Sequence, residues 1–136
     1  VMVMSEFPLD FGKHIPNKPV ALPMGTHIRV WMAIIQQADH FVGCDSVGQH
    51  IAHAYNKSAT VIIGSTYPIN TSFPDDEKFN VIDLGKDERV YSPIRVTSDE
   101  FSDRLNEGIM AMDEEVETRI VKSVQRLIKH GKNTRK

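Results

Sequence analysis

Two short apolar runs, each followed by a polar turn that contains glycine, constrain the fold of this chain most. The first run covers residues 40–43 and the second covers residues 59–63. Both are nearly continuous in apolar residues, which is typical of parallel strands that are covered on both faces. The carboxyl ends of parallel strands meet at one edge of a sheet, where such folds bind ligands. We therefore expect the turns over residues 45–50 and 64–68 to lie side by side at that edge.

The first of these turns leads directly into a predicted short helix over residues 47–55. A strand that ends in a polar turn and opens into a helix directs several backbone N–H groups at one point. That point attracts anions, above all phosphate. A purely structural interpretation is also open, because Asp45 and Ser46 are residue types that cap a helix without any ligand.

Strands and helices alternate along the rest of the chain. The order predicts a single α/β domain over residues 1–136 with a mainly parallel sheet. The pattern predicts short strands at 1–4, 20–22 and 79–84 and an extended piece over 90–96. It predicts a helix over 27–38 that begins after the cap Thr26, and a surface loop over 67–78. Helices are expected over 98–130; they begin after the cap Ser98 and break near residues 112–113.

Composition excludes several classes of protein. The net charge is −2, from 16 basic and 18 acidic residues, which gives no general attraction to nucleic acid or to an anionic membrane. No apolar run approaches the roughly 20 residues of a membrane span. The single Cys44 cannot form an internal disulfide and is typical of a reducing compartment, so we expect a cytoplasmic location. The chain does not begin with Met, and we expect a domain that is truncated at its N-terminus.

Residues 37–54, QADHFVGCDSVGQHIAHA, resemble the donor-binding half of the heptosyltransferase-like glycosyltransferases (glycosyltransferase family 9). The family signature is A-D-hydrophobic-hydrophobic-G-x-D-S-G-x-x-H-hydrophobic-A-x-A, followed by a strand and a G-[PS]-T-x-P turn. Residues 64–68, GSTYP, match that turn, and the resemblance covers residues 20–74. One position departs from the signature: Val47 stands where the family has glycine, and Gly48 follows. A β-branched residue is unfavourable at that position if the backbone there needs a positive φ.

The resemblance implies the GT-B architecture, in which two Rossmann-like halves enclose the active site. This chain would be the C-terminal half, and its partners would be a nucleotide-sugar donor and the N-terminal half, which binds the acceptor and carries the catalytic base. We therefore assign no catalytic residue, no metal and no cofactor here. In the reaction, a sugar moves from a nucleoside diphosphate sugar to an acceptor hydroxyl. By position, the resemblance implies that Asp45 binds sugar hydroxyls. It implies that the residues after Asp45, up to His50, surround the diphosphate, and that residues 64–66 lie in the neighbouring loop. The implied donor-binding residues are Asp45, Ser46, Val47, Gly48, Gln49, His50, Gly64, Ser65 and Thr66.

Other functions and other residue roles stay open at this point. The alternative to the glycosyltransferase is a non-catalytic nucleotide-binding or assembly module of Rossmann-like fold. A sugar-nucleotide epimerase is disfavoured because its motif glutamates and arginine are not evident. A metal pair at His50 and His53 lacks a matching carboxylate or thiol. We therefore expect His53 to serve packing or to support a neighbouring site residue. Arg89 and Arg95 have side chains that suit phosphate, but we expect surface roles for both. The remaining expectations are structural: a buried thiol at Cys44, a solvated loop at residues 75–77, and a packing stripe of Ile120, Val124, Leu127 and Ile128.

Overall fold

Helices and strands alternate along the described part of the chain. The structure, a computed structural model, describes residues 1–4, 19–23, 25–90 and 108–133. The elements in chain order are β1 (Met2–Val3), β2 (Val20–Ala21), α1 (Ile28–Gln37), β3 (Phe41–Cys44), α2 (Val47–Ala54), β4 (Ala59–Ile63), α3 (Pro68–Thr71), β5 (Phe79–Asp83) and α4 (Glu114–Asn133).

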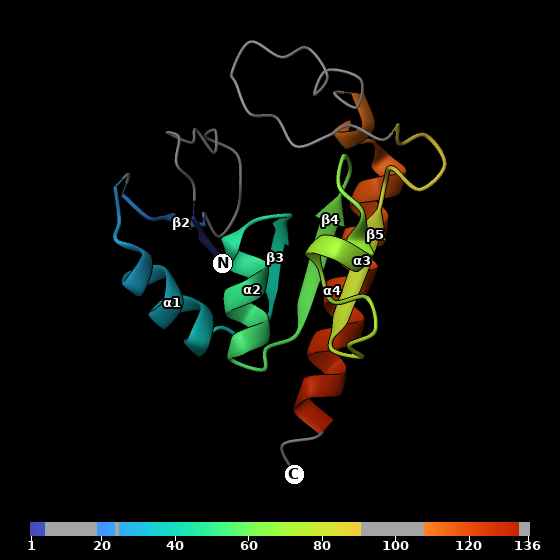
Figure 1. Ribbon diagram of the computed structural model, residues 1–136. Helices are drawn as coiled ribbons and strands as arrows, with labels where there is room; N and C mark the ends of the chain where they lie inside the picture. The colour runs from blue at the N-terminus through green and yellow to red at the C-terminus, as the bar shows by residue number, and fades with distance from the viewer. Residues whose placement is uncertain (5–18, 24, 91–107, 134–136) are drawn as a thin grey trace.

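A parallel sheet of three strands in the order β3-β4-β5 forms the centre of the fold. Phe41 of β3 lies opposite Ala59 of β4, which lies opposite Phe79 of β5. α2 and α3 lie over one face of the sheet and α4 over the other, while α1 packs on α2 (Figure 1). β1 and β2 form a separate parallel pair. The expected α/β class, with a parallel sheet flanked by helices, is confirmed.

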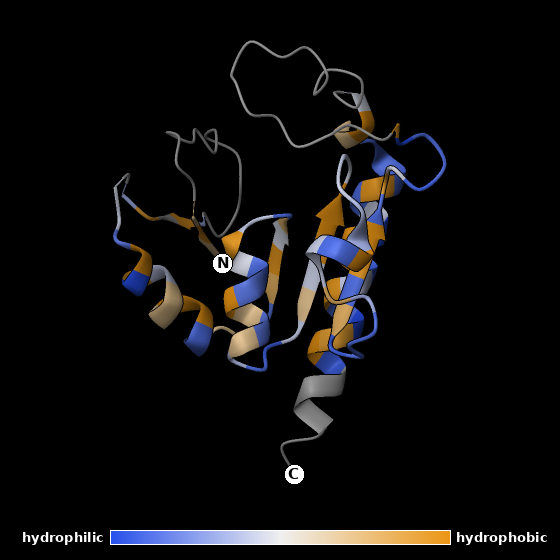
Figure 2. Cartoon of the chain, in the orientation of Figure 1, coloured by the Kyte–Doolittle hydropathy of each residue, from blue (hydrophilic) through white to orange (hydrophobic). Residues whose placement is uncertain are grey.

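β4 is the most deeply buried strand, and all five of its residues are buried. β4 ends in strongly hydrophobic residues (Figure 2). Ile35 of α1 and Ile51 and Ala52 of α2 belong to the same core cluster as Ala59, Val61 and Ile63 of β4, and α4 covers the other face. The expectation of burial on both faces is wrong for β3, because α4 packs on β4 and β5 and leaves one face of β3 open. Val42 is therefore 46% exposed. Cys44 is also exposed rather than buried.

The helix ends differ in detail from the expectation. His27, not Thr26, caps α1: its side chain accepts a hydrogen bond from the Arg29 amide at 3.2 Å, whereas Thr26 donates to the Pro23 carbonyl. Of the apolar face of α1, only Ile35 is buried. Residues 67–78 are not all loop, because they include α3, which begins with proline at a position where its missing N–H costs nothing.

The later of the expected C-terminal helices begins where the break near residues 112–113 was expected, whereas residues 108–110 form a 3₁₀ turn and residues 98–107 lie outside the described residues. α4 begins at Glu114, and Asp113 Oδ1 accepts a hydrogen bond from the Val116 amide at 2.8 Å, as an N-terminal cap does. Val116, Ser123 and Leu127 are the residues that α4 buries most deeply. The expected cap at Ser98, Arg95 and residues 91–96 of the predicted extended piece lie outside the described residues.

A chain of polar side chains joins the sheet to α4. His40 hydrogen-bonds Ser58 Oγ through Nδ1 (2.8 Å) and Thr60 Oγ1 through Nε2 (2.9 Å). Thr60 Oγ1 lies 2.6 Å from Ser123 Oγ on α4, and Asn80 of β5 donates to the same Ser123 oxygen at 2.8 Å. Burial lowers the pKa of His40 to about 4, so the imidazole in this chain is neutral near pH 7.

The described helices include none that combines the length and the apolar character needed to cross a membrane.

Candidate functional site

The turns after β3 and β4 meet at the carboxyl edge of the sheet, and the Asp45 carboxylate joins them. Asp45 Oδ1 accepts a hydrogen bond from Gln49 Nε2 at 2.8 Å, and Oδ2 accepts one from Thr66 Oγ1 at 2.6 Å. Gln49 Nε2 also donates to the Thr71 carbonyl of α3 at 3.0 Å. The side chains of three predicted site residues, Asp45, Gln49 and Thr66, therefore lie in one hydrogen-bonded group. Sequence reasoning missed the contribution of Thr71.

The first turn of α2 presents backbone donors at the same edge. Ser46 has extended backbone (φ −154°, ψ 174°), and its side chain makes no capping hydrogen bond. The Gln49 amide donates to the Ser46 carbonyl at 3.3 Å. Within the described residues, the amides of Val47 and Gly48 have no hydrogen-bond partner. These two N–H groups lie at the positive end of the helix dipole, where an anion is stabilised.

Gly48 is required for packing rather than for an unusual backbone conformation. Among the described residues, a positive φ occurs only at Gly25 and Asn56, so neither Val47 nor Gly48 is in the left-handed region. A β-carbon added at Gly48 would lie 2.5 Å from the end of the Phe41 ring, and one added at Gly43 would lie 2.6 Å from the same atom. The Phe41 ring thus fills the space that two glycines leave between β3 and α2, and Val47 occupies its position without backbone strain.

The two histidines of α2 have different surroundings. His53 stacks on Phe73 with ring centroids 3.6 Å apart, and its Nε2 lies 3.6 Å from Asp76 Oδ2. The expected packing role of His53 is confirmed. His50 meets Phe73 edge-on at 5.6 Å and is exposed. It lies three residues after Val47, so the two residues are neighbours on the helix surface.

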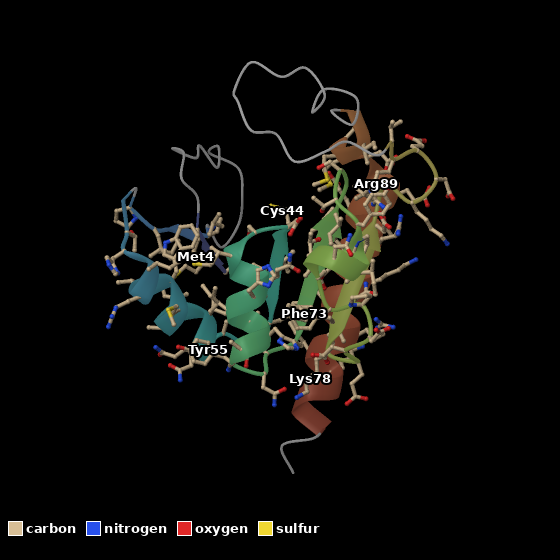
Figure 3. The ribbon with its side chains drawn as sticks, in the orientation of Figure 1. Met4, Cys44, Tyr55, Phe73, Lys78 and Arg89 are labelled. Atoms are coloured by element: carbon tan, nitrogen blue, oxygen red, sulfur yellow. The ribbon has the colours of Figure 1, made fainter. Side chains whose placement is uncertain are left out.

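Arg89, in the loop after β5, supports the turn after β4, although we expected this arginine at the surface. The Arg89 side chain is only 4% exposed, so that expectation is wrong. Arg89 Nε donates to the Gly64 carbonyl at 2.8 Å, and the guanidinium pairs with Asp83. The same guanidinium lies 4.8 Å from the centre of the Tyr67 ring. Figure 3 shows Arg89 beyond the end of β5, at the same edge of the sheet as Cys44 of β3. The signal in the sequence was the acidic residue at the end of a strand, with an arginine six residues later.

The remaining predicted residues lie at the same edge with different exposure. Gly64 is buried under the Arg89 contact, whereas Ser46 and Ser65 are exposed. Within the described ranges, no three His, Cys, Asp or Glu side chains are grouped closely enough to hold a metal ion.

Comparisons of this chain with protein-family models, with curated proteins and with solved structures find no match. The functional interpretation depends on the geometry of this edge and on the sequence resemblance.

Proposed function

We propose that this chain is the donor-binding domain of a GT-B glycosyltransferase similar to the heptosyltransferases. Such an enzyme transfers a sugar from a nucleoside diphosphate sugar to an acceptor hydroxyl. The observation that supports the proposal most is the pair of unpartnered amides at Val47 and Gly48, next to the turn over residues 64–66 and held there by the hydrogen bond between Asp45 and Thr66.

The chemistry needs an environment that stabilises a leaving diphosphate. Negative charge develops on the diphosphate as the glycosidic bond to the sugar breaks. The two amides, the dipole of α2 and a hydrogen bond from His50 would stabilise that charge without a metal ion. Asp45 accepts one protein hydrogen bond on each oxygen, and each carboxylate oxygen has a second lone pair for a sugar hydroxyl. The catalytic base and the acceptor site belong to the N-terminal half in this proposal.

The pairing of Asp45 within the protein favours a second candidate, a nucleotide-binding module that catalyses nothing. In that case Gln49 and Thr66 occupy the carboxylate for structural reasons, and the two amides bind a diphosphate with no sugar attached. The two candidates differ in whether Asp45 contributes to the affinity for the sugar.

Val47→Pro tests the amide site with little disturbance of the helix. Val47 is the first residue of α2, where proline fits a helix, and Ser46 before it is already extended, as proline requires. The substitution removes one N–H, and Val47→Ala is the matched control because it shortens the side chain and keeps that N–H. The probes are ADP, GDP, UDP and CDP, each compared with its nucleoside, in ¹H–¹⁵N NMR titrations of the 136-residue chain.

We expect at least one diphosphate to shift the amide signals of Gly48 and Thr66, and its nucleoside to leave them unchanged. Val47→Pro should weaken the diphosphate about tenfold or more, because a hydrogen bond to a charged group is worth about 1.5–3 kcal/mol. Val47→Ala should bind as the parent does. Equal binding by both variants, or shifts confined to other residues, would contradict the proposal.

Asp45→Asn then separates the two candidates. Asparagine has the same shape, so contacts to Gln49 and Thr66 can persist while the charge is lost. A donor-binding domain should lose affinity for the nucleotide sugar and keep its affinity for the matching diphosphate. Equal effects on both ligands would favour the non-catalytic module.

A further inference from the structure

A groove of about 310 Å³ lies between β5 and α4, away from the turns of the donor site. Asn80 and Ser123, which form its wall, hydrogen-bond each other at 2.8 Å, so the strand and the helix are fixed relative to one another there. The groove is lined by Asn80, Val81, Ile82, Arg119, Lys122, Ser123 and Arg126.

The charge of the groove is entirely positive. Arg119, Lys122 and Arg126 follow one another at spacings of three and four residues, so they share one flank of α4. No acidic side chain lines the groove, and among the described residues none of the three cations has an ion-pair partner. Like charges at these spacings destabilise a helix slightly when nothing neutralises them. An anion in the groove would remove that cost.

The edge of β5 adds a backbone donor. The Leu84 amide bonds the Ile63 carbonyl and the Lys78 carbonyl accepts from the Ala59 amide, so the even-numbered residues of this strand direct their backbone groups toward β4. Successive residues of a strand direct these groups to opposite sides. The Val81 N–H therefore points away from β4, on the side of the strand that has no partner strand among the described residues.

We propose that this groove binds a small ligand that carries two or more phosphate groups. Arg119 and Arg126 are seven residues apart, about 10.5 Å along the helix axis, a span that suits two or three linked phosphates better than one. Guanidinium groups bind phosphate oxygens through paired hydrogen bonds. No aromatic side chain lines the groove, so a base would find no stacking partner and recognition would be confined to the phosphates. A second copy of this chain is a poor occupant, because it would bring the same three cations to the interface.

The test is an NMR titration of the full chain with inorganic tripolyphosphate and, separately, with ATP. The groove variant combines Arg119→Gln, Lys122→Gln and Arg126→Gln. The control variant combines Arg29→Gln, Lys57→Gln and Lys86→Gln, which removes the same charge at positions outside the groove and outside α4. We expect both probes to shift the amides of Val81 and Ser123 with similar affinity. The groove variant should lose about tenfold or more in that affinity, and the control should lose less than threefold.

Three outcomes would overturn the proposal: no shifts at Val81 and Ser123, equal losses in the two variants, or ATP binding there much more tightly than tripolyphosphate. If the groove variant does not fold, Lys122→Gln against Lys86→Gln gives the same comparison with one cation each. Val47→Pro distinguishes this groove from the donor site, because it should leave the shifts at Val81 and Ser123 unchanged whether or not the donor proposal is correct.

Discussion

Gly48→Ala tests whether the glycine of the α2 turn is a packing residue. Two effects of the substitution oppose each other. Alanine is a better helix former than glycine by about 1 kcal/mol. Its β-carbon would, however, lie 2.5 and 2.7 Å from two ring atoms of Phe41, a buried side chain that Gly43 confines from its other edge. Forcing an extra carbon into a packed core costs about 1–3 kcal/mol beyond what local relaxation recovers. We expect a net loss of up to about 2 kcal/mol in the free energy of unfolding.

Urea denaturation of four proteins measures the effect: the parent, Gly48→Ala, Phe41→Leu and the double variant. Leucine removes the ring atoms that the new β-carbon would meet. Gly48→Ala should therefore be neutral or stabilising in the Phe41→Leu background, which gives a coupling free energy of about 1–3 kcal/mol between the two sites. Gly108→Ala is the matched control, because a β-carbon there meets no atom within 4 Å.

The packing explanation is wrong if Gly48→Ala stabilises the parent as much as a free helix position would, or if the two substitutions are additive. Additivity would mean that the Phe41 ring moves away at no cost. Gly48 would then need another explanation, such as close approach of the backbone to phosphate.

Two further predictions concern the buried polar groups. Burial lowers the pKa of His40 from its ordinary value of 6.5 to about 4 in the folded chain. Between these two pH values the unfolded chain binds a proton on His40 that the folded chain does not bind. Stability should therefore fall as the pH drops from 6.5 to 4. Because His40 is only partly buried, we expect the free energy of unfolding to fall by about 1–2 kcal/mol. Urea midpoints measured across this pH range should show the loss, and His40→Asn should reduce it. A pH-independent midpoint would contradict the burial of the neutral imidazole. Arg89→Met should destabilise the fold by about 3 kcal/mol at pH 7, because it leaves the Asp83 carboxylate and the Gly64 carbonyl without their partner. Thermal unfolding should show a smaller loss for the double variant with Asp83→Asn, and equal losses for the single and double variants would refute the pairing.

The sequence was sufficient to predict the order of the central elements and the edge where the turns meet. Residues 59–63 form a strand because their apolar run has helices to cover both faces, and the carboxyl-edge position of Asp45 and Thr66 follows from parallel pairing. The same reasoning overestimated the burial of β3. Its apolar residues look like those of β4, and only the position of α4 distinguishes the two strands. Local sequence contains no information about that position.

The contacts of the site were harder to predict than its location. Asp45 and Ser46 are residue types that cap helices, yet the Asp45 carboxylate accepts hydrogen bonds from the Gln49 and Thr66 side chains instead. Arg89 is charged and lies in a polar loop, and single-residue hydrophilicity places it at the surface. Its burial depends on three partners from two separate segments: Gly64 and Tyr67 in the turn after β4, and Asp83 at the end of β5. Such a combination becomes visible only when the strands are in register.

The hydroxyl of Ser123 gives α4 a defined rotational setting on the sheet. Aliphatic side chains tolerate small sliding and turning of a helix, since dispersion contacts depend weakly on direction. The hydrogen bonds that Thr60 and Asn80 make to Ser123 Oγ do not tolerate such movement, because a hydrogen bond weakens steeply when its angle changes. Rotating α4 by a single residue, about 100°, would withdraw that oxygen from both strands. Asn80 would lose this acceptor, and Thr60 would keep only His40 as a partner. These buried hydrogen bonds therefore fix the rotation of α4 about its own axis. They thereby also determine the direction in which its basic flank faces.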